Sequence, residues 1–119
     1  MVTFALLYRV IELRFYVTGD GNAPIEEWFS RLEAASAARV AVALARLEQG
    51  NLSNAKGVGE GVSEYRIDWG PGYRVFFGRH GDVLEILLTG GTKQRQQRGI
   101  DQAKLQWADY KLRRTPPAR

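Results

Sequence analysis

Apolar and polar residues alternate near the start of the chain, and this alternation predicts a strand. Within residues 11–17 the odd positions are apolar and the even positions are Glu12, Arg14 and Tyr16. A period of two is typical of a half-buried strand. We therefore expect the first element to be a strand over residues 11–17.

The next two segments have the apolar spacing of helices. Pro24 suits a first helical turn, and apolar residues follow at i, i+3, i+4 and i+7 (Ile25, Trp28, Phe29 and Leu32). A second helix is predicted from about Ser36 to Gln49, with Gly50 as its stop. The two helices form a predicted hairpin that needs one face of a sheet as its partner.

The middle of the chain reads as antiparallel strands. Residues 51–61 are rich in turn formers and predict at most a short strand. Alternation returns over residues 63–69 and 73–79, on either side of the turn Gly70-Pro71-Gly72. Residues 83–89 are nearly all apolar, as in a central strand.

The last element is predicted to be a helix from about Lys93 to Arg113, ended by Pro116-Pro117. The order of elements becomes β-α-α-β-β-β-α. The chain is thus expected to be one α+β domain over residues 1–119, in which an N-terminal strand and a helical hairpin pack on a small, mostly antiparallel sheet.

Composition narrows the function classes. The chain has 45% hydrophobic and 25% charged residues, which supports a packed core. It has no cysteine, which excludes disulfides, thiolate catalysis and zinc fingers, and its one histidine, His80, is predicted to be exposed in a turn. The apolar run at residues 1–8 is short and lacks a basic leader, and no run is long enough to cross a membrane. We expect a cytoplasmic protein without a metal or cofactor.

Positive charge gathers at the C-terminal end. The net charge of +4 divides into +6 over residues 89–119, with a basic tail at about 112–119, and −2 over the rest. This asymmetry indicates an anionic partner, for which nucleic acid is the common case. A solvated helix with a basic tail is the alternative.

Arginines on the two predicted middle strands are candidate anion ligands. If the loop between these strands has an odd number of residues, the even-numbered side chains share a face, with Arg66, Asp68, Arg74 and Phe76 together. The odd-numbered residues, which are apolar or aromatic, then pack under the helices. Ion pairs of the arginines with Asp68 and Glu64 are the alternative to an anion site.

A glycine pair and a basic cluster follow the last predicted strand. Gly90-Gly91-Thr92-Lys93 opens the last helix, and Arg95 and Arg98 lie one turn on. The segment is neither a Walker A loop nor a dinucleotide-binding fingerprint. Trp28 and Trp107 stand at helical apolar spacing and are predicted to be core residues rather than platforms for bases.

Three stretches together resemble a known family. Tyr65-Arg66-Ile67 is followed by GPGYRVFFG at residues 70–78 and LTGGTK at residues 88–93. In this order they resemble the RelE/ParE superfamily of bacterial toxin–antitoxin toxins, and most closely the HigB-like group, often labelled addiction module killer proteins. The resemblance covers nearly the whole chain.

The resemblance implies a RelE/ParE-like fold and an mRNA interferase, a toxin that cleaves mRNA in the ribosomal A site. In such toxins a ribose 2′-hydroxyl attacks the adjacent phosphate without a metal, and basic residues stabilise the developing charge. Arg66, Arg74 and Lys93 match the catalytic positions. RNA-binding roles are expected for Lys56, a looser match, and for Arg95 and Arg98.

The resemblance also implies partners and leaves alternatives. The expected partners are a cognate antitoxin of helix-turn-helix type, the ribosome and mRNA, with operator DNA bound only through the antitoxin complex and no membrane. Ile100 falls near a position where some RelE relatives have a tyrosine. A ParE-like inhibitor of DNA gyrase and an inactive homologue that binds an antitoxin or nucleic acid remain the alternatives.

Overall fold

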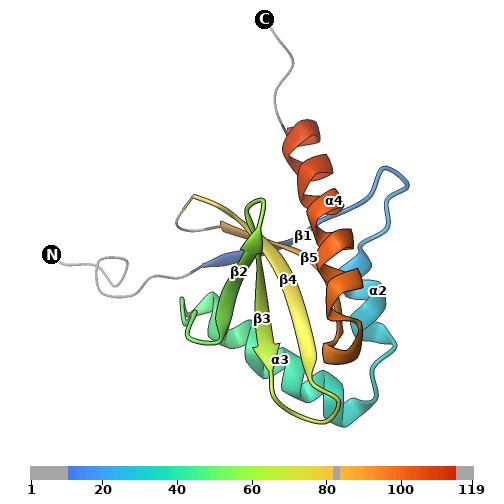
Figure 1. Ribbon diagram of the computed structural model, residues 1–119, viewed down its shortest axis with the longest axis vertical. Helices are drawn as coiled ribbons and strands as arrows, with labels where there is room; N and C mark the ends of the chain where they lie inside the picture. The colour runs from blue at the N-terminus through green and yellow to red at the C-terminus, as the bar shows by residue number, and fades with distance from the viewer. Residues whose placement is uncertain (1–10, 82–83, 115–119) are drawn as a thin grey trace, which may run out of the picture.

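The computed structural model describes residues 11–81 and 84–114, which form an α+β fold with a five-stranded mixed sheet and three helices (Figure 1). The sheet order is β1-β5-β4-β3-β2, with β1 parallel to β5 and the other neighbours antiparallel. The predicted fold class is confirmed at this level. The elements are β1 (Glu12–Phe15), α2 (Pro24–Ser30), α3 (Ala34–Glu48), β2 (Ala55–Gly59), β3 (Val62–Ile67), β4 (Tyr73–His80), β5 (Leu84–Thr92) and α4 (Gln96–Arg114).

The sheet is covered on both faces. Helices α2 and α3 lie behind it in Figure 1 and α4 lies in front. Apolar side chains fill both spaces, because each amphipathic helix buries its apolar stripe against the sheet. The α2/α3 side holds buried Ile25, Val40, Leu47, Tyr65, Val75, Phe77 and Leu87, and the α4 side holds Tyr16, Val62, Phe76, Ile86, Leu88, Ala103 and Trp107.

Both tryptophans predicted to be core residues pack against these clusters. Trp107 is 5% exposed and belongs to the cluster under α4. Trp28 is half-buried against the α2/α3 cluster, with its ring edge toward Tyr73. The core prediction is confirmed for both.

The loop between β3 and β4 sets the register that matters for function. It spans residues 68–72, an odd number, and Arg66 stands directly opposite Arg74. Gly70 and Gly72 have φ values of 58° and 77°, in the left-handed region that glycine adopts without strain. The even-numbered residues of the two strands therefore share one face, as predicted, and α4 covers this face.

Strand β2 is an element that the predicted order lacks. Residues Ala55–Gly59 pair with β3 at the edge of the sheet, so the order is β-α-α-β-β-β-β-α. The glycines at 57 and 59 remove side-chain alternation from this segment. The pairing of β2 with β3 is made by backbone hydrogen bonds, which form without an alternation of apolar and polar side chains.

The first strand is shorter than predicted, and its alternation fails at the end. It stops at Phe15, which is 47% exposed, and Val17 is 43% exposed. Tyr16 is buried instead, because α4 packs over it and its hydroxyl donates a hydrogen bond to Asp109 Oδ2 at 2.6 Å. Burial, followed by the hydrogen bond to Asp109, raises the pKa of the Tyr16 hydroxyl.

The glycine pair is part of a strand rather than of a loop before the helix. Gly90 pairs with Val75 and Gly91 with Arg74, and β5 continues to Thr92. A short 3₁₀ turn over Lys93–Arg95 then leads into α4 at Gln96. The predicted helix is otherwise confirmed. The expected stop at Pro116-Pro117 and the end of the basic tail lie outside the described residues.

Candidate functional site

The three inner strands of the sheet place a row of two arginines and a glycine near the end of the sheet that carries the β3–β4 loop. Arg66 of β3 faces Arg74 of β4, and Arg74 faces Gly91 of β5. Gly91 carries no side chain, and a Cβ added there would meet nothing within 4 Å. The row therefore ends in open space beside Arg74.

Arg74 is buried without a full set of partners. It is 4% exposed, and its Nη1 donates to the Tyr73 carbonyl at 3.1 Å, while its Nε has no hydrogen-bond partner. Among residues 11–81 and 84–114, no carboxylate lies within ion-pair distance of this guanidinium. An unpaired buried cation is costly. An anion beside Arg74 would provide the missing acceptor and charge.

Arg66 has the internal partner that the alternative interpretation expected. Its Nε donates to Glu64 Oε1 at 3.1 Å, and its side chain is 41% exposed. Glu64 is fully buried and also accepts hydrogen bonds from Gln96 Nε2 at 2.8 Å to each carboxylate oxygen. The carboxylate thus ties Arg66 to the first turn of α4. Internal ion pairing accounts for Arg66 but not for Arg74.

Asp68 and Gln96 depart from the expectations for this site. Asp68, the other expected counter-ion, is exposed and has no ion pair with either arginine. Gln96 was not predicted as a site residue. No local pattern indicates it, because its contact joins residues 32 positions apart.

Lys93 converges with Arg74 beside Gly72. Its backbone N–H donates to the Gly72 carbonyl at 2.7 Å, which fixes the start of the 3₁₀ turn against the β3–β4 loop. A Cβ added at Gly72 would lie 3.2 Å from Lys93 Cβ and 3.8 Å from Arg74 Nη1, so both side chains flank the same glycine. Lys93 also lines a shallow hollow of about 380 Å³ with the loop residues Asp68 to Gly72.

Arg95 and Arg98 line a second hollow next to the arginine row. This groove of about 320 Å³ lies between Trp28 and the start of α4 and also includes Gly91. Gly91 is therefore shared by the groove and by the row that contains Arg74. Arg95 and Arg98 therefore lie next to the arginine row. They line a different hollow from the one that Lys93 lines.

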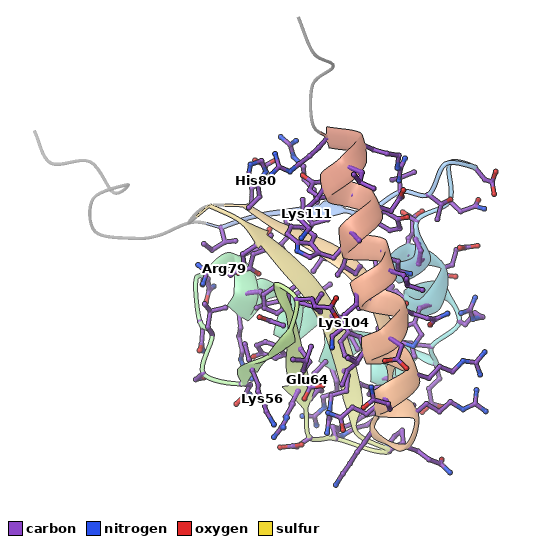
Figure 2. All side chains as sticks on the ribbon, turned by 45° about the horizontal axis from the view of Figure 1, so that its top comes forward. Lys56, Glu64, Arg79, His80, Lys104 and Lys111 are labelled. Carbon is purple, nitrogen blue, oxygen red and sulfur yellow. The ribbon has the colours of Figure 1, made fainter. Side chains whose placement is uncertain are left out.

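Lys56 lies at the edge of the same face. It is exposed on β2 and stands opposite Glu64 in the register with β3. Figure 2 shows Lys56 and Glu64 near the start of α4, whereas His80 lies at the far end of β4. His80 is exposed, as predicted, and is remote from the basic cluster.

A buried carboxylate lies at that far end. Glu85 is fully buried, and neither of its oxygens has a hydrogen-bond partner. Arg79 Nε lies 3.9 Å from Glu85 Oε1, too far for a strong ion pair. Burial raises the pKa of the Glu85 carboxyl, and the opposing effect of Arg79 is smaller.

The described part of the chain has two features that bear on membrane insertion and on metal binding. None of its helices is long and apolar enough to cross a membrane. Within the same residues, no three His, Asp or Glu side chains gather in a group that could hold a metal ion. The cluster that gathers here is cationic, and its preferred ligand is an oxyanion such as a phosphate.

A protein of known sequence is similar to most of this chain. The chain is 43% identical over 81 residues to a protein of Haemophilus influenzae that is described as uncharacterized, and the match covers 67% of this chain and 82% of the relative. No family model matches the chain.

Proposed function

We propose that this chain, which belongs to the same protein family as the uncharacterized Haemophilus influenzae protein, is the toxin of a bacterial toxin–antitoxin module and a ribosome-dependent mRNA endoribonuclease. The observation that carries the proposal is the buried guanidinium of Arg74, whose Nε lacks an acceptor beside the open space over Gly91. Lys93, which flanks Gly72 together with Arg74, is the second cation of the proposed site. The resemblance to the RelE/ParE superfamily supplies the reaction class.

The proposed reaction needs charge stabilisation more than covalent chemistry. The ribose 2′ oxygen attacks the adjacent phosphorus, the bond from phosphorus to the 5′ oxygen breaks, and a proton leaves the 2′-hydroxyl while another reaches the 5′ oxygen. Negative charge grows on the phosphate oxygens as the new bond forms. In the proposed mechanism Arg74 and Lys93 stabilise that charge, and the burial of Arg74 supports this role because such stabilisation is strong in a dehydrated site.

The remaining basic residues suit RNA binding. Arg66 is held by Glu64 yet half-exposed, so it can contact a phosphate without losing its internal partner. Lys56 on β2 and the pair Arg95 and Arg98 on the adjoining groove extend the cationic surface in both directions. Binding through these side chains is expected to weaken steeply with salt.

The proposal includes partners and a cellular location. A toxin of this kind acts on mRNA in ribosomes, so it works in the cytoplasm. It is neutralised by an antitoxin of helix-turn-helix type, and the complex of the two proteins binds operator DNA.

Inducible expression with mapping of RNA 5′ ends tests the activity. The variants are Arg74→Met, which removes the buried charge, Lys93→Ala, and Arg114→Ala as a control at an exposed cation of α4. We expect cuts within translated codons minutes after induction, and none under a translation block. Cleavage falls by about 100-fold in Arg74→Met, which loses transition-state stabilisation, and is retained in Arg114→Ala.

Thermal melting of the purified variants checks that each one folds. Persistent cleavage by a folded Arg74→Met variant contradicts the assigned site. Growth arrest with intact mRNA contradicts the nuclease activity, and a supercoiling assay then tests DNA gyrase as the target. The absence of any arrest indicates an inactive homologue.

A further inference from the structure

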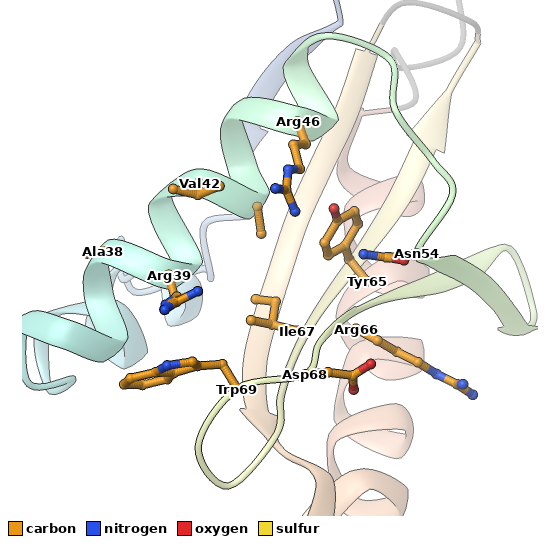
Figure 3. A pocket seen from close by; sticks show the side chains of 11 residues that line it. Ala38, Arg39, Val42, Arg46, Asn54, Tyr65, Arg66, Ile67, Asp68 and Trp69 are labelled. Atoms are coloured by element: carbon orange, nitrogen blue, oxygen red, sulfur yellow. The ribbon is translucent and has the colours of Figure 1, made fainter.

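A groove between α3 and β3 is lined mainly by residues on the opposite side of the sheet from Arg74. It has a volume of about 390 Å³, and its floor is formed by the odd-numbered residues of β3 and the loop after it. Figure 3 shows Tyr65, Ile67 and Trp69 pointing toward α3, while Arg66 and Asp68 point to the other side of the strand. Arg66 and Asp68 also line the groove, so it adjoins the proposed RNA site at Arg66 but contains neither Arg74 nor Lys93.

A buried hydroxyl in this groove lacks a partner. Tyr65 is 1% exposed, and its hydroxyl makes no hydrogen bond. In Figure 3 the hydroxyl points toward α3, where Arg46 reaches over the groove. A phenol buried without a partner lowers stability. A ligand that accepts its hydrogen bond would remove this cost.

Helix α3 contributes two arginines to the groove, and Arg66 and Asp68 line it from the side of β3. Arg39 and Arg46 are seven residues apart on α3, which separates them by two helical turns, about 10.5 Å. Among the residues that the structure describes, neither has a carboxylate within ion-pair distance. Val42 lies between them and is 50% exposed. The groove thus presents cation, apolar side chain and cation along one line.

We propose that this groove binds an acidic amphipathic peptide, in which two carboxylates about two helical turns apart flank an apolar side chain. The carboxylates pair with Arg39 and Arg46, the apolar side chain covers Val42, and a peptide polar group accepts the Tyr65 hydroxyl. RNA fits less well, because the guanidinium of Arg39 already covers the Trp69 ring at 5.3 Å from its centroid and leaves less aromatic surface for a base.

A displayed library of random peptides, each about 16 residues long, is the probe. Peptides retained by the full-length wild-type protein are sequenced, and the tightest one is labelled for fluorescence anisotropy. We expect enrichment of acidic residues six to eight positions apart with an apolar residue between them, the separation of about two helical turns. A single-stranded RNA oligonucleotide is titrated in parallel.

Matched variants assign binding to the groove. Arg39→Gln and Arg46→Gln are each expected to weaken peptide binding about threefold to fivefold, and the double variant more than tenfold. Arg114→Gln, which removes the same charge from α4, leaves binding unchanged. Tyr65→Phe weakens peptide binding while the melting temperature of the free protein stays equal or rises, because the orphaned hydroxyl is removed.

The opposite results overturn the inference. These are no retained peptide, retained peptides without acidic residues, or an affinity that the double arginine variant leaves unchanged. RNA binding that is lost in this variant assigns the groove to nucleic acid instead. Because Arg74 is not part of the groove, the peptide measurements remain valid if the proposed nuclease activity fails.

Discussion

The two glycines at the end of β5 are expected to respond very differently to the same added methyl group. A Cβ at Gly90 would lie 2.2 to 2.4 Å from the Trp28 ring, while a Cβ at Gly91 would meet nothing within 4 Å. The Trp28 indole cannot yield by rotating a flexible end, so the whole ring must move. Gly90→Ala and Gly91→Ala therefore form a matched pair on one strand.

The cost of Gly90→Ala follows from the contacts that Trp28 makes. Overpacking costs about 1–3 kcal/mol, and displacing the ring also loses its edge-to-face contact with Tyr73, at a centroid distance of 6.0 Å. That aromatic pair is worth about 1 kcal/mol. We expect a loss of about 2–4 kcal/mol, which lowers the melting temperature by roughly 10 °C. Gly91→Ala should stay within about 0.5 kcal/mol of wild type.

Urea unfolding followed by circular dichroism measures both free energies, and a double variant tests the cause. Trp28→Ala removes the ring that the new methyl group meets. Gly90→Ala should therefore cost less in the Trp28→Ala background, with a coupling of about 1–3 kcal/mol. Equal losses for the two glycine variants, or additive losses with Trp28→Ala, would refute the steric argument.

Two further predictions concern other buried groups. Burial raises the pKa of Glu85 above its ordinary 4.5, so the folded state holds the proton more tightly and stability from this group falls as the pH rises. Glu85→Gln is expected to raise the free energy of unfolding by about 1 kcal/mol at neutral pH, where the wild-type carboxyl would be charged. Well below the ordinary pKa the substitution should have no effect. Denaturant unfolding at the two pH values measures both results. Gly78→Ala places a Cβ 2.4 Å from the Trp107 ring and should cost about 1–3 kcal/mol in the same assay, a loss that Trp107→Ala should largely remove.

Local patterns were most reliable where the apolar face of a segment is also its buried face. Val40 and Leu47 mark the buried side of α3, and that helix lies within two residues of its predicted bounds. The odd-numbered loop between β3 and β4 fixed which residues share a face, because side chains alternate strictly along a strand. The shared face of Arg66 and Arg74 could therefore be predicted for an odd loop, whereas their direct pairing required the loop of residues 68–72 that the structure shows.

Local patterns failed where an element from far along the chain covers a residue. Tyr16 is buried because Asp109 and its helix, 93 residues away, pack over it, while apolar Phe15 stays exposed. Strand β2 is missing from the predicted order, although a short strand over residues 51–61 was allowed, because its ladder with β3 needs only backbone groups. The Glu64–Gln96 contact likewise depends on how α4 docks on the sheet.

The sequence by itself determined the α+β class and the helical hairpin, and for an odd-numbered loop it also placed Arg66 and Arg74 on one face, since these follow from periodicity within short segments. Only the tertiary structure decided which of the two arginines is neutralised. Both have the same side chain, and they differ in whether Glu64 lies within reach and whether α4 excludes water. Burial and ion pairing depend on contacts between distant segments, so only the folded chain shows that Arg74 is the unpaired cation.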